Sequence, residues 1–208
     1  MRTGIRARRI LFGAAAVVAL WWLFSSDEVR HPPGVLAPEE PAQTLIKEPQ
    51  TWWRGTFQIT PLADFDVRAR VLSTARYYLG RETELSPLDL VLGWGRMSDQ
   101  QVLDRLSISQ SGRWFYWRSA YQMTPPIPIP EIQSHCANMH MIPAKPEIEK
   151  ALKALRRGQV VRIQGQLVAV QARDGWNWRS SLSRDDTGNG SCELVWVSAV
   201  TVEAADGR

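Results

Sequence analysis

The chain has 208 residues, of which 44% are hydrophobic and 22% are charged. This length fits one domain with appendages, and the hydrophobic fraction excludes a disordered chain. The net charge of +4 comes from the first nine residues, because the chain from residue 10 onward holds 21 basic and 21 acidic residues. A body without surplus positive charge is unlike a phosphate-binding surface, so we expect no nucleic-acid partner.

The N-terminus has the pattern of a membrane anchor. Residues 1–9 form a basic cap, and residues 10–26 carry no charge. As a helix this run spans roughly 25 Å, against ~30 Å for a hydrocarbon core, and Trp21 and Trp22 suit the membrane interface. A cleaved signal peptide is the alternative, but cleavage needs small residues at −1 and −3, and here Ser26 pairs with Phe24 and Ser25 with Leu23. We predict a single-pass inner-membrane protein with a cytoplasmic cap, a signal anchor at 10–26 and its main domain in the periplasm.

A linker is predicted after the anchor. Residues 27–50 include five prolines without any apolar periodicity, which favours an extended polyproline-type chain. Such a linker would hold the domain off the bilayer. The extracytoplasmic globular domain is predicted over residues 51–204, with a short tail at 205–208.

The first half of the domain mixes strand and helix signals. Residues 52–59 and 65–78 are predicted as strands, the second from its clear alternation of apolar and charged residues. Ser86-Pro87 and Ser98-Asp99 resemble helix starts, which predicts helices to about residue 94 and through residue 106. Residues 113–121 are aromatic-rich and predicted as a strand, and the prolines of 125–130 predict a stiff connector.

The second half is the clearest β region. A helix is predicted at 146–157, followed by strands at 159–171, 176–183 and 192–202 with turns at 174–175 and 185–190. The run from Gly158 to Val168 resembles the opening strand of OB-like barrels, in which a mid-strand glycine such as Gly165 allows sharp coiling. The predicted fold is α+β, a small mixed β-barrel of five or six strands with two or three short helices. This resemblance implies no activity.

Tryptophan and arginine supply the candidate binding residues. The body contains eight tryptophans, and Trp176 and Trp178 share one strand face beside a turn. Exposed, such a pair could anchor a protein partner or stack on a sugar; buried, it would cap the core. The predicted binding residues are Trp114, Trp117, Trp176, Trp178 and Arg179.

His135, Cys136 and His140 are weak candidates for a metal site, because imidazole and thiolate suit zinc or copper. A spacing of five separates the two histidines on either a helix or a strand, so they could converge only in an irregular loop. We favour polar packing of a loop as the explanation of this segment, and we predict no metal and no cofactor.

Cys136 and Cys192 are the only cysteines. In an oxidising compartment they could form one disulfide, and the sequence also allows two free buried thiols or a reactive thiol.

No catalytic set stands out, so whether the protein is an enzyme stays open. The sequence favours a membrane-anchored periplasmic binding or scaffold protein that contacts another cell-envelope protein. The alternative is an envelope enzyme or a peptidoglycan- or glycan-binding module that uses the His135–His140 loop or the Trp176/Trp178 face.

Overall fold

The computed structural model describes residues 28–120, 124–183 and 192–204. The basic cap, the apolar run at 10–26, the predicted turn at 185–190 and the tail lie outside these residues. Within the described part of the chain, no helix is long and apolar enough to cross a membrane.

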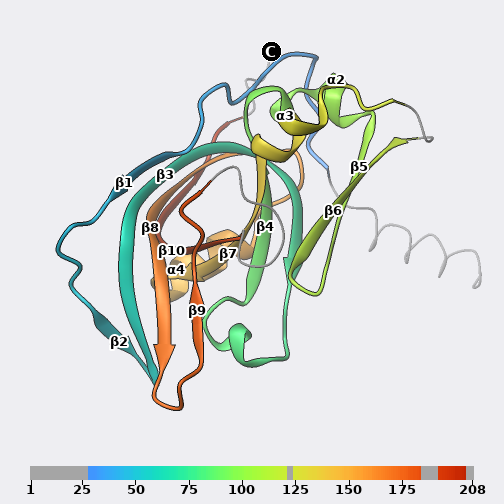
Figure 1. The fold of residues 1–208 in the computed structure, drawn as a ribbon. Helices are drawn as coiled ribbons and strands as arrows, with labels where there is room; N and C mark the ends of the chain where they lie inside the picture. Colours follow the sequence, from blue (N-terminus) through green and yellow to red (C-terminus); the bar gives the residue numbers. More distant parts are fainter. Residues whose placement is uncertain (1–27, 121–123, 184–191, 205–208) are drawn as a thin grey trace, which may run out of the picture.

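Five strands form a closed ring (Figure 1). Each strand pairs with the next, and the first pairs with the last, in the order β3, β4, β7, β10 and β8. Only β7 and β10 run parallel; the other four pairings are antiparallel. Their bounds are β3 Phe57–Arg76, β4 Leu88–Gly93, β7 Cys136–Pro143, β8 Val160–Ala172 and β10 Glu193–Val202.

Three short strands add to the outside of this ring. β1 (Ala42–Leu45) and β2 (Trp52–Arg54) pair with β3, and β9 (Asn177–Arg179) pairs with β8. The 20-residue β3 is long enough to pair with all of β8 and then with β4. Gly165 permits the close pairing of β8 and β10, since a Cβ there would lie 1.9 Å from the Trp196 carbonyl oxygen.

The main hydrophobic core fills the inside of the ring. Alternate residues of all five strands point inward, among them Val67, Leu90, Met139 and Ile163, each at most 1% exposed. Helix α4 (Pro146–Lys153) packs Ile148 and Leu152 against this cluster. Burying alternate side chains of each strand is what gives the ring its single interior.

The other elements cover the outer side of β3 and β4. A separate hairpin, β5 (Leu106–Ser111) and β6 (Trp114–Ser119), packs there with the short helices α2 (Gln100–Leu103) and α3 (Ile129–Ser134). Asp99 caps α2 by accepting from the Gln101 amide, 2.9 Å away. Two 3-10 turns complete the fold, η1 at Arg81–Glu84 and η2 at Gly95–Ser98.

Residues 28–46 lie against the body, which differs from the extended linker predicted at 27–50. The Val29 amide donates to the Arg157 carbonyl at 2.9 Å, and His31 Nε2 lies 2.8 Å from the Gly158 carbonyl oxygen. The amides of Leu36 and Ala37 both donate to Ser98 Oγ. A proline-rich chain lacks a core of its own, yet its remaining backbone donors still find partners on a folded surface.

Local patterns predicted most strands correctly and failed at three elements, and they also missed α3, which begins inside the connector expected at 125–130. The strands expected at 65–78, 113–121, 159–171 and 192–202 and the helix expected at 146–157 are present with shifted ends. The helix expected at 86–94 is strand β4, because all six of its residues are buried between the core and the covering hairpin. The loop expected at 134–140 is mostly strand β7, and β5 was not predicted. The fold is α+β, mostly sheet, with three short helices.

Candidate binding site

The site begins on the outer face of β4 and β7. Asp89 on β4 lies directly opposite His140 on β7. Asp89 is fully buried, and its Oδ2 lies 2.9 Å from His140 Nδ1. That distance suits an ion pair, although neither atom has the alignment of a hydrogen bond. Because Nδ1 faces Asp89, the Nε2 edge of the imidazole points elsewhere.

Arg113, at the turn of the β5–β6 hairpin, supplies the buried charge that Asp89 needs. Its Nη1 donates to Asp89 Oδ1 at 2.9 Å, and its Nη2 donates to the Ser86 carbonyl at 2.9 Å and to Thr83 Oγ1 at 3.1 Å. The guanidinium also lies over the ring of Tyr77, 4.2 Å from its centre. A buried carboxylate is tolerated when it is paired and hydrogen-bonded in this way.

The backbone of the hairpin turn is held as firmly as the side chain. Gly112 and Arg113 have φ of 58° and 67°, the left-handed pair that a two-residue hairpin turn requires. The Arg113 amide donates to the Tyr77 hydroxyl, and Asn138 on β7 donates to the Arg113 carbonyl at 2.9 Å. The turn is thereby fixed onto the outer face of the ring.

Burial, together with the negative charge of Asp89, raises the pKa of Tyr77 to about 12. The phenol therefore stays protonated at neutral pH and can accept from the Arg113 amide. Arg113, Asp89, Tyr77, Thr83 and Ser86 are called the Arg113 cluster below.

Trp178 on β9 closes the other side of this cluster. Its ring lies 4.8 Å from the His140 ring and 5.5 Å from the Arg113 guanidinium. Trp176 meets Trp178 edge to face at 6.1 Å. The β8–β9 turn is tied to η1 by Arg81, which donates to both carboxylate oxygens of Asp174.

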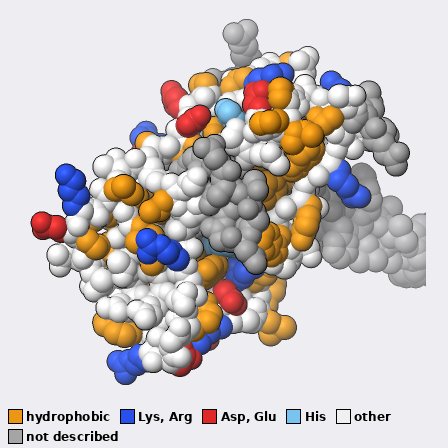
Figure 2. Space-filling view, in the orientation of Figure 1, with side chains coloured by type: hydrophobic (Ala, Val, Ile, Leu, Met, Phe, Trp, Pro, Cys, Tyr) orange, Lys and Arg blue, Asp and Glu red, His pale blue; other side chains and the backbone are white. Residues whose placement is uncertain are grey.

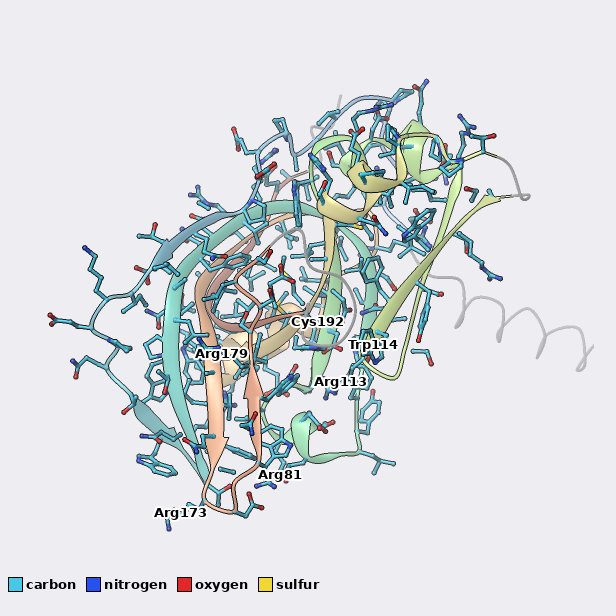
Figure 3. The ribbon with its side chains drawn as sticks, in the orientation of Figure 1. Arg81, Arg113, Trp114, Arg173, Arg179 and Cys192 are labelled. Carbon is cyan, nitrogen blue, oxygen red and sulfur yellow. The ribbon has the colours of Figure 1, made fainter. Side chains whose placement is uncertain are left out.

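These segments enclose a pocket of about 230 Å³. Figure 3 shows Arg113, Trp114 and Cys192 near one another, whereas Arg81 and Arg173 lie at the far end of β8 and β9. Aromatic rings, two arginines, a histidine and a carboxylate share the surface of the pocket. It is lined by Glu82, Arg113, Trp114, His140, Trp178, Arg179 and Cys192.

Three of the five predicted binding residues line this pocket, namely Trp114, Trp178 and Arg179. Trp117 does not, because it lies on the opposite face of β6 and packs against the hydrophobic cluster beneath the hairpin. Trp176 is half-buried beside Phe57 and the Arg81 guanidinium, also outside the pocket lining.

The candidate metal ligands do not converge. His135 ends α3, where its Nδ1 lies 2.9 Å from Ser134 Oγ and 3.1 Å from the Glu131 carbonyl. His140 faces Asp89 instead. Among the described residues, no group of three or more His, Cys, Asp or Glu could hold a metal ion.

Cys136 and Cys192 are both thiols outside any disulfide. Cys136 is buried under α3 and donates to the Ile132 carbonyl at 3.0 Å, and burial raises the pKa of its thiol to about 12. Cys192 is half-buried, lines the pocket and lies 3.8 Å from Asn138 Nδ2. A disulfide between them is therefore not formed in this structure.

Sequence reasoning missed Glu82, Asp89 and Arg113 as site residues. Asp89 carried a signal, since it is the one charged residue between Leu85 and Arg96, and a lone charge in an apolar run needs a partner. Comparison of the chain with protein-family models, with curated proteins and with solved structures found no match.

Proposed function

We propose that this chain is a membrane-anchored, extracytoplasmic binding domain that contacts another cell-envelope protein through the pocket beside Trp178. In this proposal it performs no catalysis. The apolar run at 10–26 is the anchor, and the five-stranded ring is an OB-like barrel. The observation that carries the proposal is the pocket, in which Trp114, Trp178 and Arg179 meet from distant parts of the chain.

The strand arrangement supports the OB-like interpretation. OB barrels are five-stranded and bind ligands on the face of their second and third strands, between the loops that follow the first and fourth strands. Counted along the ring strands, β4 and β7 are second and third. The pocket takes His140 from β7, Glu82 from the connection after β3, and Trp178 from the connection after β8. This is a fold-level analogy for the place of the site, and its chemistry comes from the residues.

The residue types support a protein partner. Tryptophan and arginine are the residues that most often anchor protein interfaces, particularly in a preorganised pocket. Arg179 and Trp114 are exposed, whereas the supporting residues Asp89 and His140 are buried. Because the exposed Arg179 and Trp114 lie over buried residues that are already fixed in place, they can bind a partner without a rearrangement of the domain. This lowers the free-energy cost of association.

Site-specific photocrosslinking in cells tests the site. A photoreactive amino acid at position 82, which lines the pocket, is expected to yield one defined crosslinked envelope protein. Arg179→Glu is expected to lower that yield by more than about fivefold, roughly 1 kcal/mol. Arg173→Glu is the matched control, because Arg173 is an exposed arginine of the same connection that does not line the pocket. Equal yields in both variants would contradict the proposal.

The anchor is tested separately. The full-length chain is expected to stay in the membrane pellet after alkaline carbonate treatment, and a reporter at its C-terminus is expected to be active only in the periplasm. Release by carbonate would remove the anchor from the proposal and leave the pocket experiment intact.

A glycan ligand is the second candidate, favoured by one observation: the Trp114 ring is 37% exposed and borders a pocket with arginine and carboxylate hydrogen-bonding groups. Sugars stack on such rings. Co-sedimentation of the detergent-solubilised chain with purified peptidoglycan, lost in Trp114→Ala, would favour this candidate over a protein partner.

A further inference from the structure

The structure assigns a second contact surface, the outer face of the β5–β6 hairpin, and we propose that its base rests on the anionic headgroups of the bilayer. This inference rests on the anchor of the proposed function, and it is independent of the pocket's ligand.

The described chain joins the body close to the end of the predicted anchor. Glu28 is the first described residue, only two positions after the apolar run ends at Ser26. Two residues reach at most about 7 Å. The Val29 amide already donates to the Arg157 carbonyl, and Arg30 Nη2 forms an ion pair with Asp104 Oδ1 at 2.6 Å. If residues 10–26 lie in lipid, this part of the body lies at the bilayer surface.

Asp104 stands directly before the β5–β6 hairpin, so the base of the hairpin is next to the anchor. The Ala120 amide donates to the Arg105 carbonyl at 2.8 Å and closes that base. In the hairpin register, Ser107 pairs with Arg118. Arg105 and Arg118 therefore both lie within a few residues of the point where Arg30 binds.

The outer face of the hairpin alternates serines on β5 with large residues on β6. Ser111 pairs with Trp114, Ser109 with Tyr116 and Ser107 with Arg118. All six are exposed, and Tyr116 is 54% exposed. In Figure 2 hydrophobic side chains follow the side of the molecule where the hairpin lies. Tryptophan, tyrosine and arginine are the residues that favour the membrane–water interface.

The charges of the hairpin match an anionic surface. No acidic residue occurs between Asp104 and Glu131, whereas this stretch holds Arg105, Arg113 and Arg118. Arg113 is neutralised by buried Asp89. Within the described residues, the Arg105 side chain donates to the Thr124 carbonyl and forms no ion pair, and Arg118 has no ion pair either. Arg105 and Arg118, at the base of the hairpin, are thus available to bind lipid phosphates. Each of these two arginines adds to the attraction between the hairpin and an anionic membrane.

The test uses the full-length protein in nanodiscs of two compositions, one of phosphatidylcholine alone and one with phosphatidylglycerol added. Hydrogen–deuterium exchange of residues 106–119 is expected to be slower, by roughly fivefold or more, in the anionic discs. Arg105→Glu with Arg118→Glu is expected to abolish the difference. Lys47→Glu with Arg173→Glu is the matched control, since both are exposed cations outside the hairpin and the pocket lining, and it is expected to retain the difference.

Equal exchange in the two kinds of disc, or a difference that survives Arg105→Glu with Arg118→Glu, would overturn the lipid contact. Arg118→Glu alone serves if the double variant unfolds, and it should reduce the difference by about half on a logarithmic scale. Protection that appears only when a membrane extract is added would assign the face to a protein instead. If carbonate releases the chain from the membrane, both the anchor and the lipid contact are overturned. If the chain stays in the membrane but residues 106–119 exchange equally fast in the two kinds of disc, only the lipid contact is overturned.

Discussion

Two arginines on the outside of the ring, the half-buried Arg113 and the fully buried Arg70, hold two different attachments, and they do so by different means. Arg113 holds the β5–β6 hairpin through a buried carboxylate, Asp89. Arg70, on β3, holds the N-terminal segment through neutral acceptors: the carbonyls of Val29 and Ser98 and the side-chain oxygen of Gln100. Arg70 is completely buried, and burial lowers its pKa.

The difference predicts which attachment is harder to lose. Removing Arg113 leaves a negative charge buried without its cation, which is costly. Removing Arg70 leaves three neutral oxygens short of one donor each and removes a more distant attraction to Glu28 and Asp104, a smaller penalty. The hairpin, which carries one wall of the pocket, is therefore held more firmly than the segment that leads to the anchor.

The largest expected effect comes from Arg113→Met. We expect a loss of about 3–5 kcal/mol in the free energy of unfolding, because Asp89 loses its buried counter-charge. Denaturant unfolding of the full-length protein in detergent measures it. Adding Asp89→Asn should restore part of the loss, and Arg118→Met, exposed on the same hairpin, should cost less than about 0.5 kcal/mol. Equal losses for Arg113→Met and Arg118→Met would remove the basis of the comparison.

Gly158→Ala should detach the N-terminal segment. Gly158 has φ of +88°, and a Cβ there would lie 1.8 Å from the Val29 carbonyl oxygen. We expect a cost of about 1–3 kcal/mol and fast amide exchange at Val29 and His31. Gly55→Ala is the control. Gly55 also has a positive φ, of +60°, but a Cβ added there would have no atom within 4 Å. Unchanged exchange at Val29 would show that the segment is held elsewhere.

Arg70→Met tests the weaker attachment directly. The long apolar side chain keeps the packing while three hydrogen bonds are lost, so we expect about 1–2 kcal/mol. Amide exchange should rise at residues 29–37 and stay unchanged at 106–119. A loss as large as that of Arg113→Met would mean that neutral acceptors hold an arginine as strongly as a carboxylate does here.

The smallest effect is a pH dependence confined to the Arg113 cluster. The pKa of Tyr77 is raised from 10.0 to about 12, so folding favours the protonated phenol. This stabilisation is complete below pH 10 and is lost as the pH rises from 10 to about 12. Because the thiol pKa of Cys136 is also about 12, the comparison is made in Cys136→Ala. In the Cys136→Ala background, Tyr77→Phe should reduce the fall of the unfolding midpoint between pH 10 and 12. If the midpoint falls equally with and without Tyr77→Phe, Tyr77 is not the source of the pH dependence.

Sequence patterns predicted the ring strands well where alternation was clean. β3 alternates buried and more exposed residues over more than ten positions, and β8 does so in two shorter stretches, at 161–164 and 168–172, so period-two signals identified both. β4 was predicted as a helix because Ser86 and Pro87 imitate a helix start. In the structure Ser86 Oγ donates to the Leu88 carbonyl, and both faces of the strand are covered, which erases the alternation.

Residue type alone predicted some of the residues that line the pocket and not others. Residue type selected Trp114, Trp178 and Arg179, which the structure places in the pocket lining, but the same rule selected Trp117, which packs inward. Glu82, Asp89 and Arg113 have no distinguishing local pattern as a group, because the three come from η1, β4 and a hairpin turn. Their association depends on the register that sets Asp89 opposite His140.

The sequence by itself determined the periodic elements, the charge balance of the body and the apolar run that predicts an anchor, because each of these is a property of neighbouring residues. Only the tertiary structure decided that residues 28–46 dock, that the histidines at 135 and 140 face different partners, and that Arg113 reaches Asp89. Such contacts join residues far apart in the chain, and their energy comes from burying a charge or an amide beside a partner that no local pattern specifies.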